Sequence, residues 1–109
     1  AKIILQDMVR ENAKTINVDT IQKEVAEYFR IPLSELRAKK RNKNIVMARQ
    51  VAMYLSRELA HMSLPEIGYA FGGKDHTTVL HSCKKIEQAM ETDQDLKMTL
   101  TRIITVLNT

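Results

Sequence analysis

Eight polar residues from Lys74 to Lys85 carry side chains that could read a nucleic acid. Their hydroxyl, imidazole, ammonium and carboxylate groups can donate to or accept from base edges, and several can bind phosphate. The eight are Lys74, Asp75, His76, Thr77, Thr78, His81, Lys84 and Lys85. Recognition of bases and phosphates therefore depends on whether one element presents these groups together.

The same stretch predicts a helix with two different faces. At about 100° per residue, its cationic and its apolar side chains separate onto opposite sides. The polar side carries Thr78, His81, Lys84 and Lys85, and the apolar side carries Val79, Leu80, Cys83, Ile86 and Met90. A polar start combined with an apolar rear face is typical of a DNA-reading helix docked on a scaffold. Gly72 and Gly73 end the preceding pattern, and we expect the Asp75 side chain to cap the new helix.

A short helix is predicted immediately upstream. Ser63 is a good cap for it, Leu64 and Pro65 suit its first turn, and Gly68 and Ala70 permit close helix contact. A short helix, a turn containing glycine and a longer polar-faced helix together predict a helix-turn-helix. A generic pair of helices would explain the spacing almost as well.

Positive charge is concentrated before this unit. The chain has 17 Lys and Arg against 13 Asp and Glu, a net charge of +4. Six cations and no acid lie within thirteen residues: Arg37, Lys39, Lys40, Arg41, Lys43 and Arg49. The remaining 11 basic residues against 13 acidic ones give −2, so the positive field is local, as expected for a phosphate footprint. A solvated face or a disordered segment would also produce such a run.

Apolar spacing predicts the helices that would hold these residues. They cover about 2–13, 18–29, 45–61 and 94–107, with a short helix after Pro32 that buries Leu33 and Leu36. Asn17 is a good cap for the helix over 18–29. Residues 37–44 offer almost nothing apolar and should form an exposed basic loop. The outer face of the helix over 45–61 is expected to carry Arg49, Gln50, Met53, Ser56 and Arg57.

Length and composition favour one all-α domain. The 109 residues are 44% hydrophobic but only 5% aromatic, and they include six Met. A single Cys cannot form an internal disulfide, and we find no signal-like or membrane-length apolar run. These features indicate a reducing, soluble compartment.

Catalytic and metal-binding roles find little support. Seven helical residues separate His76 from Cys83 by about 10.5 Å, too far to share one metal. No GxxxxGK[ST] motif is present for a nucleotide, and no acid–base pair converges. We therefore expect no metal, no cofactor and no catalytic residue in this chain. A helical protein–protein interaction domain with a merely solvated basic loop remains the competing class.

The stretch from Gly72 to His81, with Ser63-Leu64-Pro65-Glu66-Ile67-Gly68 and Phe71 before it, closely resembles one family. The family is the C-terminal DNA-binding domain of the bacterial replication initiator DnaA, whose signature GG[R/K]DHTTV[L/I]H is matched at every position. The likeness spans about residues 15–107. It implies an all-α, Trp-repressor-like bundle of about six to seven helices containing a helix-turn-helix. It also implies binding to DnaA boxes, which are short asymmetric duplex elements at the chromosomal origin.

The resemblance also implies roles for individual residues. Lys74, Asp75, His76 and Thr77 match positions that read bases in the major groove, and Arg41 matches an arginine that enters the minor groove. Phosphate-contacting positions are matched by Asn42, Gln50, Arg57, Leu64, Pro65, Thr78, His81 and Lys85. Two residues depart from the common pattern: Lys74 replaces an Arg and Ala48 replaces a Pro.

Residues 1–14 resemble the connector from an upstream ATPase domain, and 15–109 would be the DNA-binding domain. ATP and Mg²⁺ would belong to that upstream domain. The helix over 2–13 could pack on its own domain, on a neighbouring domain or on an acidic phospholipid surface. The resemblance implies double-stranded DNA as the partner, a cytoplasmic, nucleoid-associated protein, and a domain that is monomeric alone and oligomerises through other domains.

Overall fold

The computed structural model describes residues 16–38 and 42–108, and the regular structure within them is helical. The elements are α2 (Val18–Phe29), α3 (Leu33–Leu36), α4 (Lys43–Leu59), α5 (Leu64–Ala70), α6 (His76–Thr92) and α7 (Gln94–Leu107). The predicted all-α class is confirmed, and α2 and α7 have the predicted bounds. The helix expected over 2–13 lies outside the described residues.

Side-chain caps begin two of these helices where the sequence predicts them. Asn17 Oδ1 accepts the Thr20 N–H at 3.0 Å, and Thr20 Oγ1 accepts the Asn17 N–H at 3.1 Å. Ser63 Oγ accepts the Glu66 N–H at 3.3 Å, and the Glu66 carboxylate accepts the Ser63 N–H at 2.9 Å. Both arrangements are capping boxes, which satisfy N–H groups that have no partner inside the helix.

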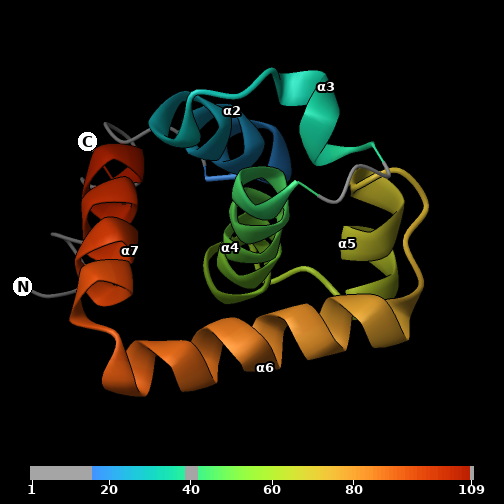
Figure 1. Cartoon of the computed structure of the whole chain (residues 1–109). Helices are drawn as coiled ribbons and strands as arrows, with labels where there is room; N and C mark the ends of the chain where they lie inside the picture. The colour runs from blue at the N-terminus through green and yellow to red at the C-terminus, as the bar shows by residue number, and fades with distance from the viewer. Residues whose placement is uncertain (1–15, 39–41, 109) are drawn as a thin grey trace, which may run out of the picture.

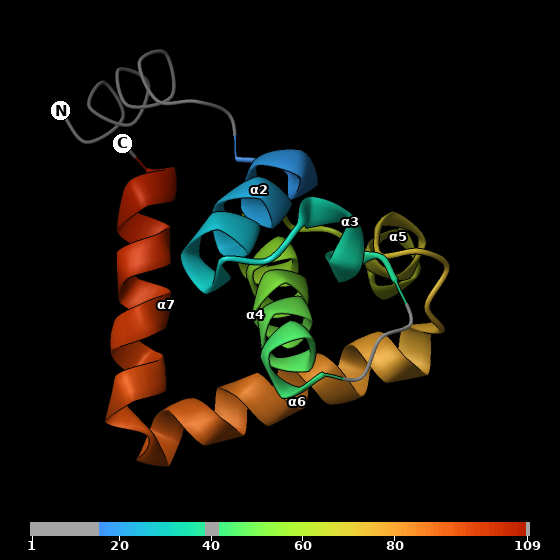
Figure 2. The ribbon, with the colours of Figure 1, turned by 45° about the horizontal axis from the view of Figure 1, so that its top comes forward.

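The long helix α4 is the centre of the fold (Figure 1). It packs against α2, α3, α5 and α6, while α7 closes the remaining side by contacting α2 and α6. Figure 2 shows the same arrangement after the molecule is turned, with α7 on one side of α4, α5 on the other and α6 below it. The helix α6 runs past one end of α4, and it links α5 at its start to α7 at its end.

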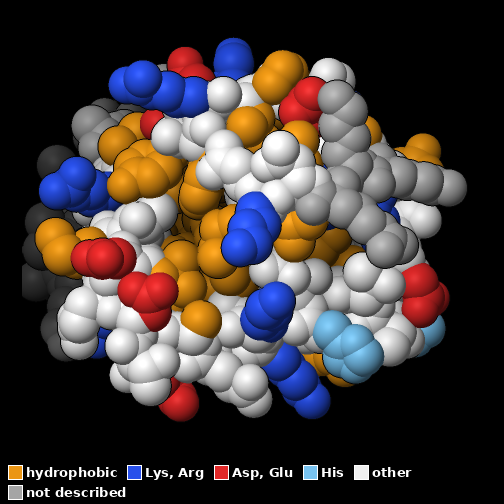
Figure 3. All heavy atoms as spheres, viewed as in Figure 1, with side chains coloured by type: hydrophobic (Ala, Val, Ile, Leu, Met, Phe, Trp, Pro, Cys, Tyr) orange, Lys and Arg blue, Asp and Glu red, His pale blue; other side chains and the backbone are white. Residues whose placement is uncertain are grey.

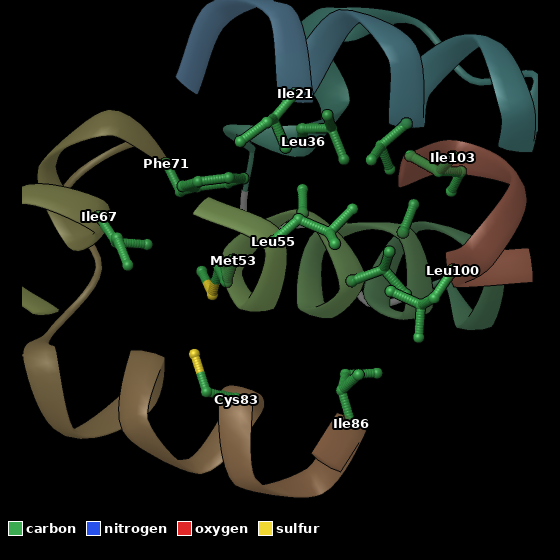
Figure 4. Packing of buried hydrophobic residues seen from close by; sticks show 14 of the residues in the cluster. Ile21, Leu36, Met53, Leu55, Ile67, Phe71, Cys83, Ile86, Leu100 and Ile103 are labelled. Atoms are coloured by element: carbon green, nitrogen blue, oxygen red, sulfur yellow. The ribbon is translucent and has the colours of Figure 1, made fainter. Parts of the chain in front are cut away.

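The core consists mainly of aliphatic side chains, drawn from each of the helices α2 to α7 (Figure 4). Its labelled members are Ile21, Leu36, Met53, Leu55, Ile67, Phe71, Cys83, Ile86, Leu100 and Ile103. Burying one large aliphatic side chain contributes about 1.5–3 kcal/mol, so this cluster supplies much of the free energy that holds the described helices together. The prediction that Cys83 is a core residue is confirmed, because only 2% of it is exposed.

The predicted outer face of α4 is partly wrong. Met53 and Ser56 are fully buried, because α4 is covered by neighbouring helices on more sides than one apolar stripe would indicate. The Ser56 hydroxyl donates to the Ala52 carbonyl oxygen at 2.8 Å, which satisfies it inside the core.

Other differences concern the edges of elements. Helix α4 begins at Lys43, earlier than predicted, because the Asn42 side chain caps it by accepting the Asn44 N–H at 2.9 Å. It also ends earlier, at Leu59, and His61 beyond it has a left-handed φ of 53°. The basic loop is correspondingly shorter than 37–44. Leu33, expected in the core, is 39% exposed at the start of α3. Residues expected on buried faces but more accessible than predicted are Tyr28, Leu80, Met90 and Ile104.

Candidate nucleic-acid interface

A tight turn joins α5 to α6 and makes the helix-turn-helix. The Gly68 carbonyl oxygen accepts the N–H groups of both Gly73, at 3.0 Å, and Lys74, at 2.8 Å. A Cβ on Gly68 would collide with the Lys74 carbonyl oxygen, so α5 and the turn approach more closely than any other residue permits. The close contact predicted from Gly68 is therefore confirmed.

The turn also rests against the chain that follows α3. Gly72 has φ of 88°, and a Cβ there would collide with the Arg37 carbonyl oxygen. Glycine is required at this position both for its backbone conformation and for the lack of a side chain. The turn before α6 and the start of the basic loop are thus packed backbone to backbone.

The start of α6 is presented to solvent, as the sequence predicts. The side chains of Asp75 and His76 are 66% and 63% exposed, and Thr77 and Thr78 are exposed as well. The opposite face is buried in the core through Val79, Cys83 and Ile86. In Figure 3, histidine side chains lie over the end of α6 where that helix begins, and Lys and Arg side chains lie over α4 and the middle of α6.

The expected capping role of Asp75 is wrong. Asp75 occupies the N-cap position with extended backbone, but its side chain makes no hydrogen bond to the helix. Its Oδ1 lies 3.5 Å from His76 Nδ1, an ion pair whenever that imidazole is protonated. The carboxylate therefore belongs to the exposed surface at the start of α6, which we call the reading helix, and takes no part in the hydrogen bonding within that helix.

The other predicted site residues lie on several elements. Asn42 caps α4, partly buried Gln50 and exposed Arg57 lie on α4, Leu64 and Pro65 form the first turn of α5, and exposed His81 and Lys85 lie on α6. Burial raises the pKa of the Cys83 thiol, and the nearby Arg57 guanidinium lowers it to a smaller extent. Arg41 lies outside the described residues.

Arg49 does not belong to an exposed basic surface. Its Nε donates to the Leu36 carbonyl oxygen at 3.2 Å, and its Nη2 donates to those of Glu35 at 3.3 Å and Ala38 at 2.8 Å. These carbonyls lie in the last turn of α3 and just beyond it, where a cation is favourable. Partial burial lowers the Arg49 pKa, but an arginine remains charged. This bonding of Arg49 to backbone carbonyls was not predicted, because a cation within a basic run of residues is expected to bind phosphate.

Arg37 is also engaged with the fold. It donates to Gln22 Oε1 at 2.8 Å and lies 3.9 Å from Asp19, while Gln22 Nε2 donates to the Ala70 carbonyl oxygen at 3.0 Å. Gln22 is fully buried and links α2, α5 and the chain after α3. The sequence offers one signal for its burial, which is its position three residues before the core residue Val25.

The Lys74 ammonium connects the two candidate DNA-binding elements. Its Nζ donates to the Ala38 carbonyl oxygen at 3.3 Å, the same oxygen that accepts from Arg49. One backbone oxygen therefore joins α4, the start of the basic loop and the turn before α6. We call these three groups, the Arg49 guanidinium, the Lys74 ammonium and the Ala38 carbonyl, the Ala38 anchor.

Neither a metal site nor a membrane-spanning helix is found within residues 16–38 and 42–108. That part of the chain contains no group of three His, Cys, Asp or Glu residues arranged to hold a metal ion. None of its helices is both long and apolar enough to cross a bilayer.

A helix-turn-helix with an exposed polar reading helix and a neighbouring basic loop defines a DNA-binding domain. Residues 18–86 match the family model described as bacterial dnaA protein helix-turn-helix. This chain therefore belongs to the bacterial DnaA helix-turn-helix family. Membership implies DNA binding in the initiation of replication.

Individual relatives agree with this assignment. The chromosomal replication initiator protein DnaA of Geotalea daltonii is 52% identical over 103 residues, which are 94% of this chain and 23% of that protein. A solved structure described as a DNA replication initiation factor matches with a TM-score of 0.73 and 32% identity, covering 84% of this chain and 29% of the other. The chain thus spans less than a third of the length of either relative.

Proposed function

We propose that this chain binds duplex DNA sequence-specifically at DnaA boxes of the replication origin. The observation that carries the proposal is the exposed start of α6, Asp75 to Thr78, which is presented by a helix-turn-helix packed against the base of a basic loop. An α-helix fits the major groove of B-DNA, where every base pair shows a distinct pattern of donors and acceptors. The exposed groups of α6 match that chemistry.

In this proposal Lys74, Asp75, His76 and Thr77 read the major groove. The Asp75 carboxylate can accept from a cytosine amino group, and Thr77 offers a thymine both a hydroxyl and a methyl group. The Lys74 ammonium has three donors, so its bond to Ala38 is compatible with a second bond to a base.

Arg41 is proposed to enter the adjacent minor groove, whose narrow stretches attract arginine. The described base of its loop supports this, because the Ala38 anchor holds that base beside the turn before α6. Phosphate contacts are proposed for Asn42, Gln50, Arg57, Leu64, Pro65, Thr78, His81 and Lys85.

Further proposals concern the longer protein to which the relatives point. We propose that residues 1–14 lead from an upstream ATPase domain, which would bind ATP and Mg²⁺ and through which copies would oligomerise. The protein would then act on the chromosome in the cytoplasm. Contact of residues 1–14 with acidic phospholipids belongs to the same set of proposals.

A salt titration tests the central proposal. Affinity is measured for a duplex with one DnaA box and for a scrambled duplex of equal length and composition. We expect tighter binding to the box and a slope of log K against log[salt] of several units, because phosphate neutralisation releases counterions. Equal affinity for both duplexes would remove the sequence-specific function, and a slope near zero would favour a protein-binding module.

A further inference from the structure

The Ala38 anchor ties together both ends of the basic loop. The loop leaves α3 at Leu36 and enters α4 after Asn42, and Arg49 lies on α4 two turns beyond that entry. Its guanidinium reaches back to the carbonyl oxygens of Leu36 and Ala38. One side chain therefore links the helix that follows the loop to the backbone that precedes it.

The anchor also holds the chain after α3 beside the turn before α6. The Lys74 ammonium bonds to the Ala38 oxygen, and the Gly72 backbone packs on the Arg37 carbonyl. A protein that contacts two grooves at once benefits when its two contacting elements are held in place before binding, because less ordering is then required. The geometry around Ala38 provides that ordering.

We propose that Arg49 is a positioning residue for DNA binding and not a phosphate ligand. It fixes the chain at Leu36 and Ala38, from which the basic loop leaves, against the helix-turn-helix, and in the proposed complex this favours the minor-groove contact of Arg41. The inference rests on the proposed function. The alternative hypothesis, which the sequence alone favours, is that Arg49 neutralises a phosphate directly.

Salt dependence separates the two roles. Arg49→Met retains the aliphatic stem but removes the donors, and we expect it to weaken binding to the boxed duplex by about tenfold or more. The salt slope on scrambled DNA should remain that of the parent, because no phosphate contact is lost. Lys85→Met, at a proposed phosphate contact, is the comparison and should lower that slope by about one. A slope lowered by Arg49→Met to the same extent would overturn the inference.

A double-mutant cycle tests whether Arg49 acts through the loop. In an Arg41→Ala background, Arg49→Met should cost much less boxed affinity than it costs in the parent, because the residue to be placed is already gone. Arg49→Lys, which can bond to fewer carbonyls, should give an intermediate affinity. Independent effects of the two substitutions would contradict a positioning role.

A measurement on the unsubstituted chain covers the case in which the Arg49 variants unfold. The Nε–H proton of Arg49 gives its own NMR signal, assigned by its loss in Arg49→Lys, or by through-bond correlation if that variant is unfolded. Because it is bonded to Leu36, we expect this signal to change little when boxed DNA is added. A large displacement, of the kind a new phosphate partner produces, would overturn the inference. If the parent shows no preference for the box, the proposed function fails. The bond from Arg49 to Leu36 is still tested in that case, because the Arg49 Nε–H signal is observed in the DNA-free protein.

Discussion

Lys74 and Gly68 touch each other through their backbones in two ways. The Lys74 N–H donates to the Gly68 carbonyl oxygen at 2.8 Å, and the Lys74 carbonyl oxygen occupies the place that a Cβ on residue 68 would need. The position of the reading helix relative to α5 therefore depends on the absence of a single methyl group.

Gly68→Ala should destabilise the domain. The new methyl group must displace backbone and not a flexible side chain, so we expect the free energy of unfolding to fall by about 1–3 kcal/mol, measured by urea denaturation. The adjacent substitution Tyr69→Ala is the control, since Tyr69 is 86% exposed and should change stability by less than about 0.5 kcal/mol. Unaltered stability in Gly68→Ala would show that the turn can move without cost.

Asp75 and Asp93 offer a matched pair, because both are N-cap residues and only one makes a cap. Asp93 Oδ1 accepts the Leu96 N–H at 3.1 Å, whereas the Asp75 side chain makes no such bond. Asp93→Ala should lower stability by about 1 kcal/mol and leave DNA binding unchanged. Asp75→Ala should melt close to the parent but change the preference at one base pair, tested with boxes substituted at each position in turn. A melting loss in Asp75→Ala equal to that of Asp93→Ala would restore the capping role.

Arg41→Ala should weaken binding to the boxed duplex by about 1–3 kcal/mol, without unfolding the domain. The reason is its proposed entry into the minor groove from a segment, residues 37–44, whose single apolar residue is Ala38. Lys40→Ala should instead weaken boxed and scrambled duplexes alike and lower the salt slope by about one. Nearly unchanged affinity in Arg41→Ala would exclude Arg41 from the interface.

The capping box of α5 should make stability depend on pH. The Glu66 carboxylate accepts a hydrogen bond from the Ser63 N–H at 2.9 Å, and this bond, together with the nearby Ser63 side chain, lowers the pKa of Glu66 below the ordinary 4.5. A depressed folded-state pKa stabilises the fold above the unfolded-state value, and the contribution is lost as pH falls through the folded value. Glu66→Gln should therefore melt below the parent at neutral pH, and the gap should close as pH falls below 4.5. Thermal melts from neutral to acidic pH would show this, and a constant gap would contradict it.

Local patterns predicted most of the fold. The capping box at Ser63, the glycine turn and the amphipathic periods of α2 and α7 each depend on residues within four positions of one another, so the sequence shows them directly. The burial of Met53 and Ser56 was missed because it depends on how many helices surround α4. That is a property of the whole packing and not of the α4 sequence.

The candidate site was predicted unevenly for a related reason. The exposed start of α6 follows from helical periodicity, but the partners of a cation do not. Arg49 bonds to carbonyl oxygens 11, 13 and 14 residues away, and nothing in its own neighbourhood distinguishes those partners from a phosphate. The same limit applies to Asp75, whose position was predicted correctly and whose hydrogen bonding was not.

In the proposed binding mode, the Ala38 anchor would give a bound copy a direction along the duplex. Helix-turn-helix proteins that bind as symmetric dimers contact two equivalent half-sites, so their binding sites are palindromic and have no orientation. Here the turn before α6 is bonded to the chain at Ala38 from which the basic loop leaves, so two unlike elements start from one place in one chain. In the proposed binding mode, reversing the site would exchange which groove segment each element meets. The orientation of each box would then decide which way the remainder of the protein points, and a row of boxes would order neighbouring copies by their polarity.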